Sequence, residues 1–251
     1  GNSENTSFWM SAHILRALKM AQDAGYPVEL NLNGLKVEYA HTRPYRGMKL
    51  EDIEILHALH EWKVEADYSS AVRLLEPFVR QLEQKEDSLA NRNKYYRPLS
   101  YLKEKLLLWE IKQQVDSVNV GDSVRPYLKK DMLEGVYCDD GRRTYYWEGN
   151  QMINTLIAYR IIKNDPSLCK LKENMQLYIL RTKERGWNTY QASSAVATVL
   201  TDLLAGSGGM SGTSVSVSGK DHQRITEFPY HARLTAGDSL LISKTGKEPL
   251  L

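Results

Sequence analysis

Apolar residues recur at intervals of three and four from residue 8 to about residue 205. This spacing places them on one face of an α-helix, so it predicts helices rather than strands. Helices are expected over residues 8–24, 50–66, 69–85, 99–115 and, as a short element, 123–133. Gly25 ends the first helix, and Pro77 makes the third one kink or restart. The polar residues 87–94 are expected to link the third helix to the fourth.

Three further helices indicate how the helical part is layered. Residues 150–163 are apolar on most sides, which predicts a buried helix, whereas residues 168–184 are amphipathic. Residues 190–205 are rich in alanine and serine, which let helix axes approach closely. Buried and amphipathic helices therefore alternate, and two concentric helical layers would give that order. We expect a mainly α protein, built as an α/α toroid or barrel of helical hairpins.

The composition changes at Gly206. Residues 206–212 are glycine- and serine-rich and predict a flexible link, and short stretches with strand patterns follow at 214–218, 225–230 and 240–243. This organisation predicts a helical domain over residues 1–205. Residues 206–251 are expected to hold the link and the strands at the start or edge of a following β-domain.

The composition of the 251-residue chain excludes several classes of protein. Hydrophobic residues make up 42% of it and charged residues 25%, enough to bury a core. A net charge of +2 argues against a nucleic-acid partner, because proteins that bind nucleic acids usually carry a basic stripe. No apolar run approaches the roughly 18 residues of a membrane span. Two cysteines, Cys138 and Cys169, are too few for a disulfide framework or a zinc cluster, and their pairing stays open.

The chain has 15 tyrosines and 5 tryptophans but only 3 phenylalanines. Tyrosine and tryptophan suit positions that are apolar on one side and exposed to solvent on the other, such as helix edges or a groove. Most tryptophans fall on expected helices or their entry loops, where they would fill gaps between layers. Tyr145, Tyr146 and Trp147, in the polar loop 135–149, remain as a candidate contact surface.

The same loop contains three carboxylates, Asp139, Asp140 and Glu148. Glycosidases and polysaccharide lyases with α/α barrels pair loop carboxylates with stacking aromatics, so a carbohydrate-active enzyme is the alternative function. It requires two of these carboxylates to face each other across a cleft of about 5–10 Å. The simpler interpretation is that Asp139-Asp140-Gly141 forms a turn.

Other catalytic patterns are weak. His57 and His60 lie three residues apart with Glu61 beside them, but they match neither zinc-peptidase pattern, and no third ligand is identifiable. We interpret them as a partly exposed helix face. Cys138 has no base beside it in the sequence, and Cys169 falls within an expected helix. We therefore expect no catalytic, cofactor-binding or metal-binding residues, and no cofactor.

Three segments resemble a known family. The run Gly186-Trp187-Asn188-Thr189-Tyr190-Gln191-Ala192 follows a helix with basic residues at its end. It is similar to the Trp-x-Thr-x-x-Ala segment that opens an inner helix in the thioester-type helical domain of bacterial α2-macroglobulins. The opening Phe8-Trp9-Met10-Ser11-Ala12 resembles an upstream inner helix of that domain, and residues 219–246 resemble the β-segment after it.

This resemblance implies a non-catalytic domain of a large bacterial protein that traps or inhibits proteases in the periplasm or at the cell surface. Its partners would be proteases or other domains of the same protein. The family's Cys-Gly-Glu-Gln thioester motif is absent, because Asp139 follows Cys138 and Lys170 follows Cys169. Either the motif lies upstream of residue 1 or this branch lacks it. The resemblance therefore transfers a fold and a broad role but no reactive residue.

Overall fold

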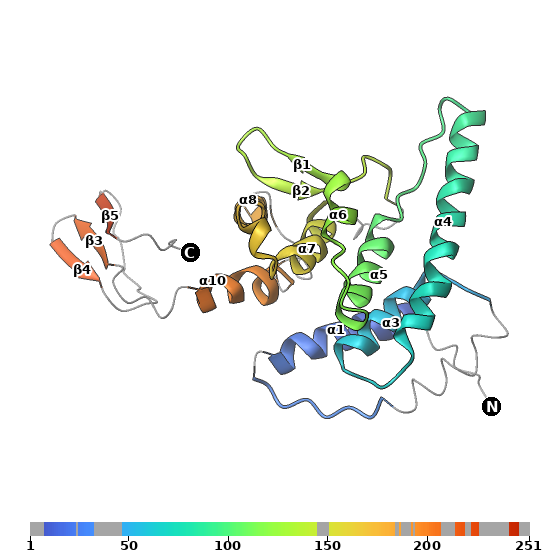
Figure 1. Ribbon diagram of the computed structural model, residues 1–251. Coiled ribbons are helices and arrows are strands. Elements are labelled where there is room, and N and C mark those ends of the chain that lie inside the picture. The colour runs from blue at the N-terminus through green and yellow to red at the C-terminus, as the bar shows by residue number, and fades with distance from the viewer. Residues whose placement is uncertain are drawn as a thin grey trace. The chain divides into compact units, whose positions relative to one another are not determined.

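A computed structural model describes residues 8–23, 25–32, 47–144, 151–183, 186, 192, 194–206, 214–218, 222–225 and 241–245. The chain divides into two compact units, residues 1–199 and residues 200–251. The described part is mainly helical and contains two small antiparallel sheets (Figure 1). None of the described helices is both long and apolar enough to cross a bilayer.

The first unit contains the principal helices of the protein. They are α1 (Phe8–Asp23), α3 (Glu51–Glu61), α4 (Tyr68–Arg92), α5 (Leu102–Val115), α6 (Gly121–Val124), α7 (Gln151–Ile162) and α8 (Cys169–Thr182). A π-helical turn, η4 (Val196–Leu200), follows. The expected helices at 8–24, 99–115, 150–163 and 168–184 are confirmed, and the one at 50–66 ends earlier, at Glu61.

Three helices form a buried row. In sequence order, α3 packs on α5 and α5 packs on α7, while α1 lies against α3 (Figure 1). Side chains of α3 are buried from Asp52 to Leu59 without interruption, and those of α7 from Met152 to Tyr159. A helix that is buried all round must be covered by neighbours on every side. The helices α4 and α8 bury only one stripe each and pack on α5 and α7, respectively.

The contact between α1 and α3 closes one end of this row. Ala12 and Leu15 of α1 pack against Ile55, Ala58 and Leu59 of α3 in one buried apolar cluster. Just after α3, the indole N–H of Trp62 donates a 2.9 Å hydrogen bond to the carbonyl of Leu15. The tryptophan thus fills a gap between two helices and satisfies its one polar atom, as the excess of such residues suggested.

Helix α4 is longer than its sequence suggested. It runs for 25 residues, continues through Pro77 and includes residues 87–92, which were expected to be a link. Pro77 is exposed, so its ring lies on the solvent side of the helix. Near the end of α4, the buried Glu86 accepts 2.8 Å hydrogen bonds from the Tyr96 hydroxyl and the Leu99 amide. These bonds anchor the following chain to the helix, which explains why the polar turn stays helical.

The expected helix over 123–133 is wrong. Only one turn, α6, forms, followed by a 3₁₀ turn, η1 (Arg125–Tyr127), and the hairpin of β1 (Leu128–Lys130) and β2 (Val136–Cys138). The strands are antiparallel, with Leu128 opposite Cys138. One side chain organises the turn between them, because Asp131 Oδ1 accepts hydrogen bonds from the amides of Leu133 (2.9 Å) and Gly135 (2.7 Å). Such a bonded aspartate favours a turn over a helix.

The second unit contains α10 (Thr201–Gly206) and a three-stranded antiparallel sheet. In this sheet β3 (Ser214–Ser218) lies between β4 (His222–Ile225) and β5 (Leu241–Thr245). The strands expected at 214–218 and 240–243 are confirmed. The strand expected at 225–230 overlaps β4 only at Ile225, and residues 226–230 lie outside the described part, so the rest of that expectation stays a prediction.

Candidate functional site

Charged side chains from four helices meet inside the first unit, and Glu54 of α3 is the centre of one group. Its carboxylate lies 2.5 Å from Arg16 Nη1 of α1 and 2.6 Å from Lys103 Nζ of α5, and all three side chains are at most 9% exposed. Burial alone would raise the pKa of Glu54, but the two cations outweigh burial and hold this pKa well below its usual range. Glu54 is therefore an ionised carboxylate shared by two cations.

Glu110 of α5 is the centre of a second group. Its carboxylate accepts two hydrogen bonds from Arg160 of α7, at 2.6 and 2.7 Å, and its Oε2 lies 2.8 Å from Nε2 of His57 of α3. The other ring nitrogen of His57 lies 3.4 Å from Glu61. Burial lowers the pKa of His57, but Glu61 and Glu110 outweigh burial, so this pKa is raised. The His57 ring thus lies between two carboxylates, which favour its protonated form.

The pKa values of two further carboxyl groups, those of Glu61 and Glu104, shift in opposite directions. Burial raises the pKa of Glu61, but His57 and the nearby arginines outweigh that and lower it to about 2. Burial dominates at Glu104, where Lys103 only partly offsets it, and the pKa rises to about 7. Glu104 therefore changes its charge near neutral pH, whereas Glu61 stays ionised.

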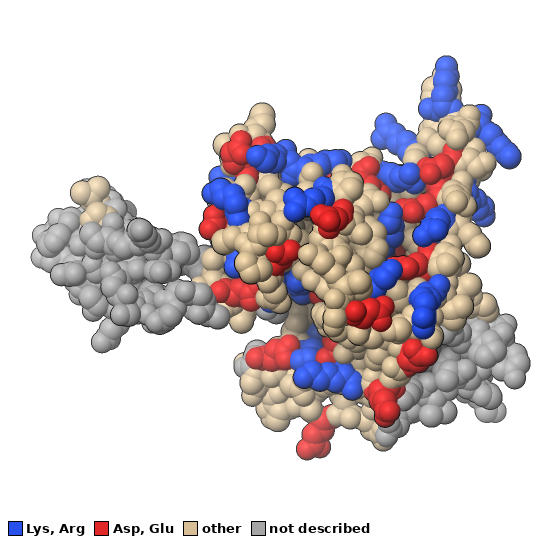
Figure 2. All heavy atoms as spheres, viewed as in Figure 1, with Lys and Arg blue, Asp and Glu red and all other residues tan. Residues whose placement is uncertain are grey.

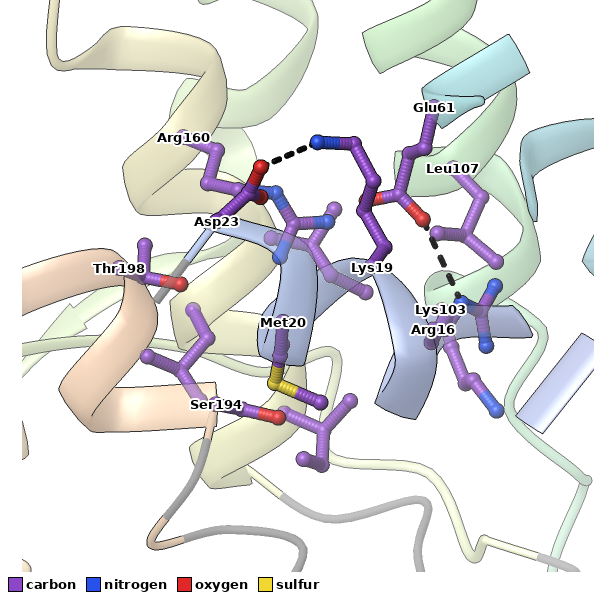
Figure 3. A pocket seen from close by; sticks show the side chains of 13 residues that line it. Arg16, Lys19, Met20, Asp23, Glu61, Lys103, Leu107, Arg160, Ser194 and Thr198 are labelled. Carbon is purple, nitrogen blue, oxygen red and sulfur yellow. Dashed lines mark hydrogen bonds and ion pairs between the residues drawn. The ribbon is translucent and has the colours of Figure 1, made fainter. Parts of the chain in front are cut away.

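Of the charged residues described so far, Arg16, Glu61, Lys103 and Arg160 line a cavity of about 150 Å³. Figure 3 shows side chains from α1, α3, α5 and α7, together with Ser194 and Thr198, around it. Its polar lining consists of Arg16, Lys19, Asp23, Glu61, Lys103, Arg160, Ser194 and Thr198. Its apolar lining consists of Met20, Leu107, Ile153, Leu156 and Ile157. The cavity is thus lined by both charged and apolar side chains.

The predicted contact surface at Tyr145, Tyr146 and Trp147 lies outside the described residues, as does Glu148. That Glu148 faces Asp139 or Asp140 across a cleft therefore stays a prediction.

The other two loop carboxylates are engaged in local structure. Asp139 lies 3.0 Å from Lys129 Nζ and accepts a 3.1 Å hydrogen bond from the Gly141 amide. Asp140 accepts hydrogen bonds from the Ser100 hydroxyl at 2.8 Å and from the Arg142 amide at 3.0 Å. Gly141 has a positive φ of 73°. These contacts agree with the interpretation of Asp139-Asp140-Gly141 as a turn.

The interpretation of the two histidines as a partly exposed helix face is wrong for His57, which is 1% exposed. Its burial is possible because Glu61 and Glu110 supply opposite charges. His60 is half-buried and packs edge-on against Tyr68, with 4.9 Å between ring centroids. Within the described ranges, no group of three histidine, cysteine or acidic side chains could hold a metal ion.

The two cysteines are free thiols rather than a disulfide. Cys138 is fully buried, and burial raises the pKa of its thiol to about 12. Because the thiolate is the nucleophilic form, Cys138 is inert at neutral pH. Cys169 lies exposed at the start of α8.

Sequence reasoning missed the charged cluster as a unit. One signal was available, because Glu54 stands between Ile53 and Ile55, and Glu110 between Trp109 and Ile111. A carboxylate amid residues of a buried helix needs a cation from elsewhere. The sequence contains 33 lysines and arginines, so this signal does not identify which of them is the partner.

Comparison of the chain with protein-family models, with curated proteins and with solved structures finds no match. The functional interpretation therefore depends on the residues of this chain, their geometry and the resemblance found in the sequence.

Proposed function

We propose that this chain is a non-catalytic helical domain of a bacterial α2-macroglobulin-like protein that traps proteases. One observation carries the proposal beyond the sequence resemblance. Helices α3, α5 and α7 are buried almost all round, whereas α4 and α8 bury one stripe each. This division into inner and outer helices is what an α/α toroid of this family requires.

The order of the helices along the chain supports the same proposal. An inner helix, α3, is followed by an outer one, α4, and the inner α7 is followed by the outer α8. Between the inner helices α5 and α7, the chain instead forms α6 and the hairpin of β1 and β2. We propose that these elements take the place of an outer helix in a toroid.

A scaffold rather than an enzyme agrees with the polar groups of the loop. Asp139 and Asp140 hold a turn together, and the charged groups of the core are paired with one another. Figure 2 shows basic and acidic side chains interspersed over the viewed face, which favours a protein partner over a nucleic acid. The proposed role places the protein in the periplasm or at the cell surface, where it meets foreign proteases.

A protease-protection assay tests this proposal on the full-length protein that contains the chain. The protein is incubated with a broad-specificity protease, and cleavage of a small peptide and of a large protein substrate is measured. A trap encloses the protease, so we expect peptide cleavage to persist while cleavage of the large substrate falls at least tenfold. Mass measurement of the mixture then distinguishes covalent from non-covalent capture.

Two results would contradict the proposal. One is unchanged cleavage of the large substrate at a molar excess of the protein. The other is release of reducing sugars from polysaccharides by the protein, abolished by Asp139→Asn and retained by the neighbouring surface variant Glu134→Gln. That second result would establish the carbohydrate-active alternative instead.

A further inference from the structure

The carboxylates of α4 all interact with other groups of the first unit. They are Glu76, Glu83, Glu86 and Asp87. Their respective partners are Lys112, Lys105, the Tyr96 hydroxyl with the Leu99 amide, and Arg142. The negative charges of this helix are therefore engaged within the protein.

One exposed face near the end of α4 carries basic and apolar residues instead. Lys85, Leu89 and Arg92 follow one another at intervals of four and three residues, so they share a face of the helix. All three side chains are exposed. Basic and acidic side chains mix over most of the first unit, but on this face of the helix the cations stand beside an apolar residue.

The chain that follows α4 continues this surface. Lys94, Tyr95 and Arg97 are exposed, and Tyr95 is the most exposed of them known by number, at 81%. The Lys94 ammonium lies 5.0 Å from the centroid of the Tyr95 ring. We call the six residues Lys85, Leu89, Arg92, Lys94, Tyr95 and Arg97 the α4 tip.

The four cations of the α4 tip are not compensated by nearby carboxylates. Within the part of the chain that the structure describes, none of Lys85, Arg92, Lys94 and Arg97 forms an ion pair. The nearest carboxylates along the chain are those of Glu86, which is buried, and Asp87, which pairs with Arg142. Figure 2 shows basic side chains around this end of the helix.

The α4 tip also projects from the helices beside it. Lys105, near the start of α5, pairs with Glu83, so the last turns of α4 extend beyond α5 (Figure 1). The tip is thus a convex surface with four cations, one exposed leucine and one exposed tyrosine.

We propose that the α4 tip binds the surface of a membrane that contains anionic lipids. Lysine and arginine side chains are attracted to anionic headgroups, each strengthening binding roughly fivefold. Tyrosine favours the boundary between headgroups and acyl chains, and a partly inserted leucine adds apolar contact. The contact is peripheral, with the tip lying on the bilayer surface.

The size and shape of the tip favour a membrane over an acidic protein partner. A specific protein interface buries about 800 Å² on each partner and involves about 20–30 residues of each. The α4 tip has six residues and is convex. A membrane surface needs no such area, because it accommodates a projecting tip and each cation contributes separately.

Co-sedimentation of the 251-residue chain with lipid vesicles tests the proposal. One set of vesicles is phosphatidylcholine alone, and the other contains about 30% phosphatidylglycerol. In about 0.1 M salt we expect binding to the anionic vesicles to be roughly tenfold tighter or more, and to weaken at least about fivefold in about 0.5 M salt. Equal binding to both sets, or no binding to either, would overturn the proposal.

A fourfold variant locates the contact. It combines Lys85→Gln, Arg92→Gln, Lys94→Gln and Arg97→Gln. Its control removes the same charge from exposed positions elsewhere and combines Arg125→Gln, Lys130→Gln, Lys170→Gln and Lys183→Gln. We expect the tip variant to bind anionic vesicles roughly tenfold more weakly or worse, and the control to change binding by under about twofold. Equal losses in the two variants would refute a contact through the tip.

A fluorescence measurement shows whether the tip reaches the lipid. Tyr95→Trp adds an emitter to the tip, and its emission is the difference between the variant and the parent protein. Vesicles with brominated acyl chains should quench this added emission about twofold or more, because an aromatic ring at the tip would lie at the headgroup level. Added emission that is unchanged by brominated lipid would contradict the proposal.

Two further measurements separate the remaining outcomes. Circular dichroism identifies a variant that fails to fold, and in that case the milder pair Lys94→Gln and Arg97→Gln replaces the fourfold variant. Binding of poly-glutamate without binding of anionic vesicles would identify an acidic protein segment as the partner and overturn the membrane proposal. Vesicle binding is independent of protease trapping, so either proposal can fail while the other stands.

Discussion

At the scale of single residues, Glu110 has the most demanding environment of the charged cluster. Its carboxylate is 8% exposed and lies against both Arg160 and His57. Removing one partner of a buried ion pair leaves the other charge without compensation, and this costs more than the pair contributes as a whole. The side chain of Arg160 is 25% exposed, so water can relieve part of that cost.

We expect Glu110→Gln to lower the free energy of unfolding by about 3 kcal/mol, as measured by urea denaturation at pH 7. The matched control is Glu76→Gln. Glu76 pairs with Lys112 of the same helix α5, but these side chains are 24% and 35% exposed. Such a partly exposed pair contributes under about 1 kcal/mol. Similar losses in the two variants would contradict the assigned burial of the Glu110 pair.

Replacing Glu104 should have the opposite effect on the free energy of unfolding, and this effect should depend on pH. Its pKa is about 7 in the folded protein, against an ordinary value of 4.5. Between these two values the folded state keeps a proton that the unfolded state has lost, so the free energy of unfolding falls as pH rises. Above pH 7 the penalty is complete, at about 3 kcal/mol.

We therefore expect Glu104→Gln to be more stable than the parent protein by about 3 kcal/mol at pH 8, and nearly equal to it at pH 4. Urea denaturation of both proteins from pH 4 to pH 8 measures this difference. Glu134→Gln, at an exposed position of the hairpin, serves as the control and should change stability by under about 0.5 kcal/mol. A difference between Glu104→Gln and the parent that does not vary with pH would rule out this titration.

At the scale of elements, Pro77 is the exception inside α4. A proline in a helix interior has no amide hydrogen, so the carbonyl one turn earlier, at Arg73, receives no helical hydrogen bond from position 77. The helix continues nonetheless, because α4 packs on α5 and has buried residues on both sides of this position, Leu75 and Val79. Tertiary packing therefore maintains a helix that its local sequence would interrupt.

Pro77→Ala should raise the free energy of unfolding by about 1–2 kcal/mol in urea denaturation. The restored amide bond and better helix propensity outweigh the greater freedom of the unfolded chain. Pro126 is the control, since it occupies the first turn of η1, where no amide bond is needed. Pro126→Ala should give no gain. A loss of stability in Pro77→Ala would show that the proline is adapted to its site.

The hairpin of β1 and β2 shows where local patterns mislead. Leu128 and Met132 lie four residues apart, which is a helical spacing, but Asp131 and Gly135 allow a turn that closes two strands. The hairpin then gains contacts with distant residues, since the buried Cys138 amide donates a 2.9 Å hydrogen bond to the Thr155 hydroxyl of α7. The formation of β1 and β2 therefore depends on α7, a helix too far along the chain to lie in a window of neighbouring residues.

At the scale of the whole molecule, the sequence determined most of the helices. Periodicity identified α1, α5, α7 and α8, and it separated the buried α7 from the amphipathic α8. This succeeds because the apolar pattern of a helix is a local record of which of its faces meet water.

Only the tertiary structure decided which charges meet inside the protein. Arg16, Glu54, Lys103, Glu110 and Arg160 come from four helices, and the sequence does not show which of the cations meets which carboxylate. Burial of a charge is tolerable only where an opposite charge is delivered to it from another part of the chain. The sequence therefore determined the helices and their apolar faces, whereas their packing created the charged cavity.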